Sequence, residues 1–242
     1  MWDETSVGGA GALVAFRDGV WMMFGWGPRF PVEGAVETPP EALLGAPPGG
    51  ARALRWCRQV HGRILASLSP EPGKPLAAAG PVGRCDGLLT DEPGILLAVR
   101  TADCVPVLIH GGGVVAAVHA GWRGAAAGIV TGAVRRFLVE YGVRPDDLAA
   151  SLGPHVGPCH YEVGPEVVEA LRPSAGPEEA WLRDRRVDLG AVLRHQLVAA
   201  GLRASAVETV GGCTACDPGL ASYRRDGGAA GRQWSAIVLV AE

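Results

Sequence analysis

The chain lacks several features that mark particular protein classes. Among its 242 residues Lys74 is the only lysine, an arginine preference that codon bias explains more simply than function does. The net charge is only −3 and no basic face is clustered, which argues against a nucleic-acid partner. There is also no internal repeat, heptad pattern or low-complexity tail.

A secretory leader and long apolar runs are missing as well. The first four residues, Met-Trp-Asp-Glu, are acidic where a signal peptide needs a basic region. The apolar run at residues 20–26 is far too short to span a bilayer. We therefore expect a cytoplasmic protein with no membrane partner. In that compartment the six cysteines are better explained by metal binding or catalysis than by disulfides.

Length and composition predict one compact domain over residues 1–242, as a monomer or small homo-oligomer. An apolar content of 48% is ample for a core. The Pro- and Gly-rich stretches at 39–50 and 70–83 are short and lie between apolar segments. We interpret them as surface loops rather than interdomain linkers.

Short apolar runs and longer periodic segments together predict a mixed α+β fold. Val- and Ile-rich runs at 95–99, 105–109 and 114–118 are typical of buried strands. The three glycines at 111–113 predict a hairpin between the last two runs. Further predictions are a helix over 129–141 ended by Gly142, a helix from Asp188 to Gly201, a short helix over 167–171 opened by Pro165, and a strand over 235–240.

Two histidines and a cysteine form the strongest candidate site. Cys104 precedes a predicted strand, His119 ends another apolar run, and His61 lies in a Gln-Val-His-Gly segment. Each alone fits a buried structural residue. All three, however, end apolar runs beside Gly or Asp, where side chains project into clefts. Two His and one Cys with an open fourth position indicate a catalytic rather than a structural zinc site.

Two basic segments are candidate anion-binding sites. Arg123 lies at the start of the helix expected after His119, where free N–H groups favour phosphate or carboxylate. Packing of Arg123 on Trp122 is an equally good structural alternative. A Gly-rich loop with Tyr223, Arg225 and Arg232 is by default solvated, but can also hold an anion and stack on a planar ring.

The other cysteines and histidines give weaker signals. Cys213 and Cys216 form a Cys-x-x-Cys, but no second pair and no thioredoxin-like helix follow, which disfavours zinc or redox function. Cys159 and His160 lie in a rigid Gly/Pro turn that can line a cleft. The remaining residues are interpreted as structural or solvated: His110 and His195 as exposed, and Cys57 and Cys85 as core or loop thiols.

Several segments taken together resemble one family. They are Gln59-Val60-His61-Gly62, Cys85-Asp86-Gly87-Leu88-Leu89-Thr90, Thr101-Ala102-Asp103-Cys104-Val105-Pro106-Val107, His119-Ala120-Gly121-Trp122-Arg123-Gly124, residues 153–164, Cys213-Thr214, Ser222-Tyr223-Arg224-Arg225-Asp226 and Gly231-Arg232-Gln233. In this order, over about residues 56–240, they resemble the YfiH family. That family is also called the laccase-domain or polyphenol oxidoreductase family, and is assigned as purine nucleoside phosphorylases.

The resemblance implies a fold, a metal and an activity. The implied fold is a mixed sheet or sandwich flanked by helices, similar to that of a bacterial toxin deamidase that uses a Cys–His pair. The implied ligands of zinc are His61, Cys104 and His119. The implied reaction is phosphorolysis of adenosine or inosine to the base and ribose 1-phosphate, with adenosine deamination and methylthioadenosine cleavage as further activities.

The chain departs from the family pattern in two places. The Ser-Leu-Asn-Leu and Asn-Arg elements, which help to form the substrate pocket in relatives, are missing from residues 29–52. At Cys159-His160 the family usually has two cysteines. The first departure leaves the substrate preference open.

The chemistry assigns roles to the candidate residues. Zinc held by the three ligands lowers the pKa of bound water toward 7, so that hydroxide can attack C6 of adenine. Cys104 and His119 are thus catalytic as well as metal-binding, and Asp103 or Glu162 is the candidate acid or base. The candidates for contacting purine nucleoside and phosphate are Gln59, Arg123, Tyr223, Arg225 and Arg232.

Three other functions remain open at this point. A copper-dependent polyphenol oxidase matches the family's older label, but needs more His clusters than six scattered His provide. A metal-free hydrolase would use Cys104 as nucleophile and His119 as base on an amide such as a peptidoglycan or glutamine bond. A binding protein that edits or escorts cell-wall precursors is the third.

Overall fold

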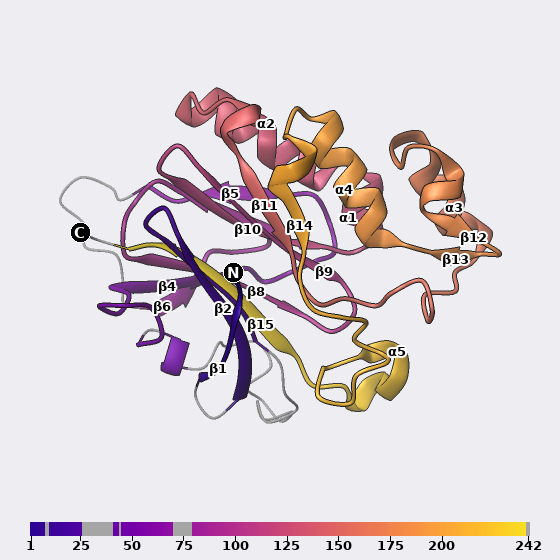
Figure 1. The fold of residues 1–242 in the computed structure, drawn as a ribbon, viewed down its shortest axis with the longest axis horizontal. Coiled ribbons are helices and arrows are strands. Elements are labelled where there is room, and N and C mark those ends of the chain that lie inside the picture. The colour runs from indigo at the N-terminus through magenta and orange to yellow at the C-terminus, as the bar shows by residue number, and fades with distance from the viewer. Residues whose placement is uncertain (8–9, 26–40, 44, 70–78, 241–242) are drawn as a thin grey trace.

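Two stacked β-sheets form the centre of the protein (Figure 1). The structure is a computed structural model that describes residues 1–7, 10–25, 41–43, 45–69 and 79–240. The seven-stranded sheet has the order β1-β2-β3-β15-β8-β4-β6, and the six-stranded sheet has the order β14-β11-β9-β10-β7-β5. Both sheets mix parallel and antiparallel pairs.

In the described part of the chain a long series of strands precedes the first α-helix, and later strands and helices are interspersed. The strands are β1 (Asp3–Val7), β2 (Ala10–Arg17), β3 (Val20–Gly25), β4 (Ala53–Trp56), β5 (Leu65–Ser67), β6 (Ala79–Pro81), β7 (Gly87–Thr90), β8 (Ile95–Thr101), β9 (Val105–Gly111), β10 (Val114–Ala120), β11 (Ala149–Leu152), β12 (Leu182–Arg183), β13 (Arg186–Val187), β14 (Val207–Thr209) and β15 (Gln233–Leu239). The α-helices are α1 (Trp122–Ala126), α2 (Ile129–Tyr141), α3 (Pro165–Leu171), α4 (Leu189–Ala199) and α5 (Tyr223–Asp226). Single 3₁₀ turns are η2 (Glu41–Leu43), η3 (Pro145–Asp147), η4 (Arg172–Ser174), η5 (Glu178–Ala180), η6 (Ala204–Ala206) and η7 (Gly227–Ala229).

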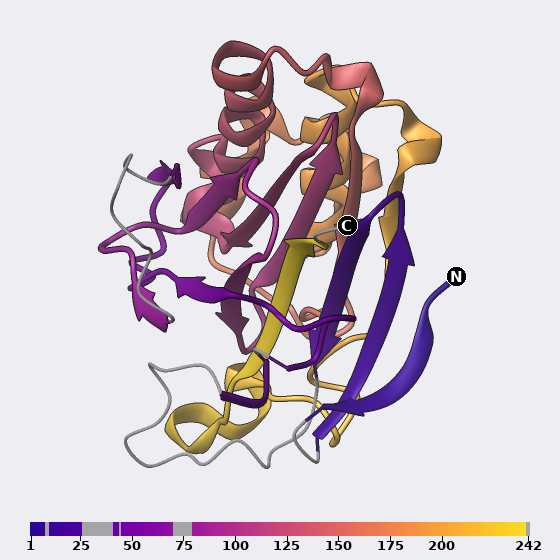
Figure 2. The same cartoon turned by 90° about the vertical axis from the view of Figure 1, so that its left-hand side faces the viewer.

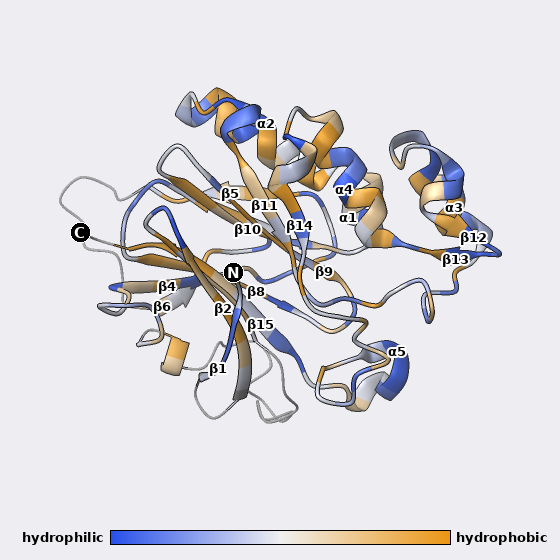
Figure 3. Ribbon diagram, in the orientation of Figure 1, coloured by the Kyte–Doolittle hydropathy of each residue, from blue (hydrophilic) through white to orange (hydrophobic). Residues whose placement is uncertain are grey.

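The central strands are apolar throughout because they are buried on both faces. In β10, Val114 and Val118 pack under the helices, whereas Val115 packs between the two sheets. Helices α2 and α4 cover the six-stranded sheet, and the N-terminal strands lie on the opposite side of the molecule (Figures 1 and 2). In Figure 3 the strands are accordingly the most apolar part, and the helices alternate between apolar and polar residues.

The predicted mixed α+β class and its main elements are confirmed. The runs predicted as strands are β8, β9, β10 and β15, and β9 pairs with β10 through the glycine turn. Helix α2 ends at Gly142 in the left-handed conformation, with φ of 71°. Helix α4 begins after Asp188, whose side chain accepts a hydrogen bond from the Ala191 N–H. None of the helices in the described ranges is long and apolar enough to cross a membrane.

Other predictions need correction. The helix expected after His119 is two helices, because Gly128 in the left-handed conformation separates the five-residue α1 from α2. Strand β6 occupies part of the 70–83 segment predicted as a loop, most of which lies outside the described residues. His110 is buried rather than exposed, because its strand β9 lies in the middle of the sheet. The exposed position of His195 is confirmed.

The N-terminal strands were not predicted. Strands β2 and β3 form a hairpin around Asp18 and Gly19, both at positive φ. An Asp-Gly pair between apolar runs is a strong hairpin signal, which was available in the sequence. The region from 29 to 52, where family elements are missing, lies partly outside the described residues.

Candidate metal centre and active-site cavity

The β9–β10 hairpin brings two predicted metal ligands to one end of the six-stranded sheet. In the antiparallel register His119 of β10 lies opposite Pro106 of β9. Cys104, just before β9, is therefore next to His119. The third residue, His61, comes from the loop between β4 and β5. Because β5 and β10 both pair with β7, this loop returns to the same end of the sheet.

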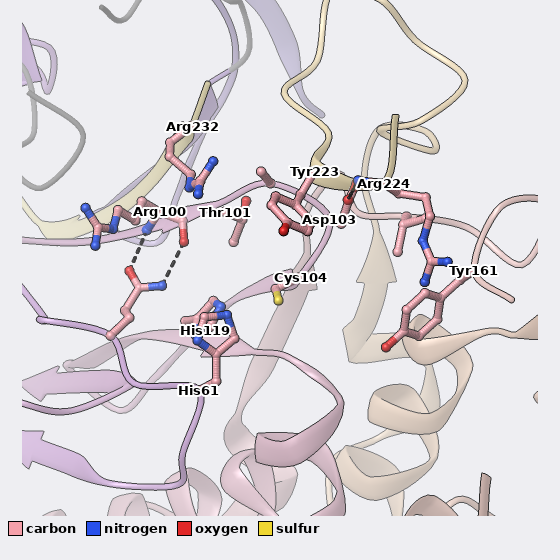
Figure 4. Close-up of a pocket in the computed structure, with 13 residues that line it drawn as sticks. His61, Arg100, Thr101, Asp103, Cys104, His119, Tyr161, Tyr223, Arg224 and Arg232 are labelled. Carbon is pink, nitrogen blue, oxygen red and sulfur yellow. Dashed lines mark hydrogen bonds between the residues drawn. The ribbon is translucent and has the colours of Figure 1, made fainter. Parts of the chain in front are cut away.

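The three side chains converge on one point, and we call them the His–Cys–His cluster. One ligand atom from each of His61, Cys104 and His119 lies within 4.8 Å of the others (Figure 4). The two imidazoles meet edge to face, with ring centroids 4.8 Å apart. His119 is buried whereas His61 is exposed, so the cluster is closed toward the sheet and open on its other side.

A buried carboxylate, Asp86, holds both histidines in place. Its Oδ1 lies 3.0 Å from Nδ1 of His119 and accepts the backbone N–H of His61 at 2.9 Å. Its Oδ2 accepts the N–H of Gly62 at 2.7 Å. Since Asp86 engages Nδ1 of His119, Nε2 is the nitrogen left for a metal ion or a proton. The sequence singled out the Asp-Gly segment but gave Asp86 no role.

The backbone around the cluster is shaped for these contacts. His61 has φ of 58°, a left-handed conformation that is uncommon outside glycine. This conformation turns the successive N–H groups of residues 60–62 onto the Asp86 carboxylate, which offsets the strain. On the other side, a Cβ at Gly121 would lie 3.0 Å from Cys104 Sγ. A larger residue there would push the sulfur out of the cluster.

Electrostatics favour an ionised Cys104–His119 pair in the absence of an ion. Burial opposes ionisation of Cys104, but hydrogen bonds from His119 and His61 outweigh it and lower the pKa of the thiol to about 6. Burial also opposes the charged form of His119, but hydrogen bonds to Asp86 and Cys104 raise the pKa of the imidazole to about 9. Asp86 is likewise ionised, because hydrogen bonds from His119 and Gly62 overcome its burial and lower its pKa.

The donor set fits a borderline or soft divalent ion. A thiolate and two imidazoles are three ligands of the kind that zinc takes in catalytic sites, with a fourth position left for water or substrate. The thiolate is already the favoured form near neutral pH, and Asp86 fixes the orientation of one imidazole. Both features lower the cost of binding an ion.

A cavity of about 580 Å³ opens over the cluster. This volume is within the range of small-molecule sites. Its lining comprises Gln59, His61, Arg100, Thr101, Ala102, Asp103, Cys104, His119, Val156, Tyr161, Tyr223, Arg224 and Arg232. A second cavity of about 90 Å³ shares His61, Cys104 and Tyr161 with the first and extends to Arg123. The cluster thus lies between a large recess and a small one.

Asp103, predicted as an acid or base, is used to build the cavity wall. Its Oδ1 accepts the hydroxyl protons of Thr214 at 2.6 Å and of Ser222 at 2.7 Å, and its Oδ2 accepts the Arg224 N–H at 2.5 Å. The residue has φ of 89°, a conformation held by these contacts. These three donors hold the Asp103 carboxylate against the loop that carries Thr214 and the start of α5.

Tyr161 lines both cavities, although sequence reasoning assigned it no role. Burial raises the pKa of its phenol to about 12, and the charge on Cys104 adds to the effect. The hydroxyl therefore stays protonated and can donate a hydrogen bond into the site. The guanidinium of Arg224 lies 5.4 Å from the Tyr161 ring centroid, which places a positive charge at the same wall. Tyr223 lines the large cavity and is 59% exposed, so its ring is accessible for stacking.

The arginines predicted to hold phosphate lie in different places. Arg232 lines the large cavity, where its Nη1 also donates to the carbonyls of Ala230 and Gly231. Arg123 lines the small cavity with its guanidinium 4.3 Å from the Trp122 ring centroid, so the packing alternative is confirmed. Helix α1 has only five residues and no side-chain cap, so its dipole adds little to an anion seat there.

Arg225, predicted to contact phosphate, does not line either cavity. Its guanidinium donates to the backbone carbonyls of Thr214, Asp217 and Leu220. It also makes two hydrogen bonds to the Asp226 carboxylate. These contacts use all five of its N–H donors. Arg225 therefore fastens the loop before α5, and the neighbouring Arg224 faces the cavity.

The fold also determines the positions of two other candidates, Gln59 and Glu162. Gln59 lines the large cavity, but both ends of its amide already bond the backbone of Arg100, at 2.8 and 2.9 Å. It therefore ties the His61 loop to β8. Glu162, the other acid or base candidate, is exposed, pairs with Arg185 and lines neither cavity. The position of Glu162 in a surface ion pair therefore gives its predicted acid or base role no support.

A family model described as multi-copper polyphenol oxidoreductase laccase matches residues 35–240. The chain belongs to this family, the YfiH family. A purine nucleoside phosphorylase named YlmD from Geobacillus stearothermophilus is 38% identical over 76% of this YfiH-family chain and 72% of its own length. The purine nucleoside phosphorylase YfiH of Escherichia coli is 36% identical over 76% of this chain and 73% of its own.

Solved structures agree with this assignment. The crystal structure of a hypothetical protein YfiH from Bacillus licheniformis superposes with a TM-score of 0.81 at 27% identity. It covers 94% of this chain and 96% of its own. The structure of Geobacillus YlmD has a TM-score of 0.70 at 36% identity, with 79% and 75% coverage. The family description and the names of relatives thus point to different chemistries, oxidation and phosphorolysis.

Proposed function

We propose that this protein is a zinc-dependent purine nucleoside phosphorylase. It would cleave adenosine or inosine with phosphate, releasing the base and ribose 1-phosphate. Adenosine deamination and methylthioadenosine cleavage would take place at the same site. The proposal is carried by the His–Cys–His cluster lying in a nucleoside-sized cavity that is also lined by the accessible Tyr223 and by three arginines. The names of the relatives support the same class of reaction.

His61, Cys104 and His119 would hold the ion. Zinc bound there would act as a Lewis acid on a substrate oxygen and lower the pKa of a bound water toward 7. Asp86 keeps the Nδ1 proton of His119 in a hydrogen bond and so leaves Nε2 free to bind. The phenol of Tyr161, which lines the cavity and stays protonated, would donate to a leaving base or a ribose oxygen.

Phosphate would bind to arginines that line the large cavity. Arg224 and Arg232 both line it, and a guanidinium binds phosphate through paired, charge-assisted hydrogen bonds. Asp103 positions Arg224 through its backbone N–H. Tyr223 offers an exposed ring for stacking on the purine. These groups would bring phosphate, ribose and base together over the cluster.

One observation favours a second function, a metal-free Cys–His hydrolase. Cys104, His119 and Asp86 form a thiolate, an imidazolium and an orienting carboxylate, which is the arrangement of a nucleophile, its base and an orienting group. The copper oxidase has less support. Four-electron oxygen chemistry needs several coppers with mainly histidine ligands, and the clusters found among the described residues contain only His61, His119 and His160.

The test combines metal analysis with product analysis. Purified protein is stripped with a chelator and reconstituted with zinc or with copper, then incubated with inosine or adenosine with and without phosphate. Chromatography should show free base and ribose 1-phosphate only with zinc and phosphate together. Phosphorolysis that survives full metal removal would refute the zinc requirement, and copper-dependent oxygen consumption on a phenol would support the oxidase. Either result would reject the proposal.

A further inference from the structure

A second cluster of thiols and an imidazole lies outside the cavity. It consists of Cys159 and His160, in the turn after β11, and Cys213 and Cys216, in the loop after β14. Their ligand atoms all lie within 4.8 Å of one another. We call this group the Cys₃–His cluster. The sequence disfavoured zinc at the Cys-x-x-Cys because no second pair follows it. The fold supplies the missing pair from earlier in the chain, where His160 lies 53 residues before Cys213.

The spacing of the four donor atoms matches a tetrahedral zinc site. Around zinc, with bonds of about 2.3 Å to sulfur and about 2.0 Å to nitrogen, neighbouring ligands lie about 3.5 to 3.8 Å apart. Nδ1 of His160 lies 3.3, 3.8 and 3.4 Å from the sulfurs of Cys159, Cys213 and Cys216. The sulfurs of Cys159 and Cys216 are 3.5 Å apart. One imidazole nitrogen therefore faces three sulfurs at metal-site distances.

The backbone holds the two ligand pairs against each other. The N–H groups of Cys216 and Asp217 both donate to the Cys213 carbonyl, which forms the tight turn of a Cys-x-x-Cys ligand pair. The Thr214 N–H donates to the His155 carbonyl and joins this turn to the Cys159 segment. The Gly157 N–H donates to Cys213 Sγ at 3.2 Å, a contact that stabilises a thiolate. The site is thus organised by main-chain contacts.

We propose that Cys159, His160, Cys213 and Cys216 bind one structural zinc ion. Four protein donors complete a tetrahedral shell, so no position remains for water or substrate. Three thiolates select zinc over magnesium or calcium, which prefer oxygen ligands. The site differs in this respect from the His–Cys–His cluster. It does not depend on the proposed phosphorylase function, since no member of the cluster lines the large cavity.

The ion would fix one wall of the active-site cavity. Tyr161 follows His160 directly, and Thr214 lies between Cys213 and Cys216. Tyr161 lines the cavity, and the Thr214 hydroxyl donates to Asp103, next to Cys104. Zinc bound by the Cys₃–His cluster would therefore clamp the segments that carry Tyr161 and orient Asp103. Its loss would loosen the wall without removing any group that contacts the substrate.

Zinc counting on matched variants tests the site. Zinc is measured by mass spectrometry after gel filtration of the full chain. Wild type and the control Cys57→Ser should hold about two ions per chain, and both Cys104→Ala and the double variant Cys213→Ser/Cys216→Ser about one. Cobalt added to stripped Cys104→Ala protein should give the intense absorption of a tetrahedral thiolate site. This readout does not require the double variant to fold.

Three results would overturn the site. Cys104→Ala could bind no zinc or cobalt, or the double variant could retain as much zinc as wild type. Wild type could instead carry a Cys159–Cys216 disulfide, which peptide mapping without reduction would detect. The zinc content of Cys104→Ala separates this proposal from the phosphorylase proposal. One zinc ion in Cys104→Ala, together with a lack of phosphorolysis by the wild type, would reject only the latter.

Discussion

The two clusters are built from the same types of side chain, cysteine and histidine, but differ in ligand number and surroundings. The His–Cys–His cluster has three donors, a buried histidine and a carboxylate that orients it, and it opens into a cavity. The Cys₃–His cluster has four donors, three of them on exposed residues, and is held by backbone N–H groups and turns. The clusters also differ in their cysteine content, with one thiol in the first and three in the second. The number of protein ligands and the cavity beside them separate a reactive centre from a structural one.

The largest expected difference is between removing one sulfur from each cluster. Cys104→Ala should lower kcat/KM for phosphorolysis at least about 10³-fold, equal to about 4 kcal/mol of transition-state stabilisation. Cys216→Ala should lower it only a few-fold, because its cluster contacts no substrate. Steady-state assays at saturating phosphate measure both. Equal losses would show that the two clusters do not differ in function.

Asp86→Asn should have the next largest effect, confined to the His–Cys–His cluster. An amide cannot accept from the N–H groups of residues 60–62 and from His119 together, so a donor would be left unpaired. We expect zinc affinity to fall about 10- to 100-fold. Stability should fall by about 3 kcal/mol in urea unfolding.

The matched control is Asp91→Asn, because Asp91 is an exposed residue just after β7. This variant should change neither the zinc affinity nor the stability. Zinc affinity is measured by competition with a chromogenic chelator. If Asp86→Asn behaves like the control, Asp86 does not orient the histidines.

Two arginines from the same loop region should give different phenotypes. Arg232 lines the cavity, so Arg232→Ala should raise the phosphate KM about tenfold and change hydrolytic deamination much less. Arg225 fastens the loop that carries Cys213 and Cys216, so Arg225→Ala should lower the melting temperature instead. The phosphate KM and calorimetry are measured on both variants. The reverse pattern would exchange their assigned roles.

The smallest expected effect is a difference between the two clusters in the pH at which their thiols become reactive. In stripped protein, hydrogen bonds from the histidines overcome burial and lower the Cys104 pKa to about 6, whereas contacts with Cys159 and Cys213 raise the Cys216 pKa to about 11. Because the thiolate is the reactive form, iodoacetamide should label Cys104 with a midpoint near pH 6 and Cys216 far above neutral pH. Peptide mapping by mass spectrometry follows each cysteine. Coincident profiles would contradict the electrostatic difference.

The elements best predicted from sequence are those whose burial is nearly uniform. Strands β8, β9 and β10 are apolar on both faces, so each appears as a continuous run. Helices α2 and α4 carry a regular apolar face and recognisable ends at Gly142 and Asp188. The N-terminal strands β1–β3 were missed although their Asp-Gly turn is a readable signal.

Side-chain roles are harder to read from sequence, because they depend on partners distant in sequence. Asp103 and Arg225 are the kinds of residue that catalyse and bind phosphate, and nothing local shows that their hydrogen bonds are already used. Asp86 was overlooked for the converse reason, because its partners are backbone groups of the loop before β5 and a histidine on β10. Such contacts exist only after the sheet has formed.

The sequence by itself determined the central strands and helices, and motif order pointed to the family. It also indicated that His61, Cys104 and His119 belong together, since each ends an apolar run at a strand edge. Only the tertiary structure decided which donors meet, because antiparallel pairing of β9 with β10 and the return of the His61 loop set distances that no spacing encodes. The same reason explains the Cys₃–His cluster, in which two turns after separate strands bring together an imidazole and three sulfurs.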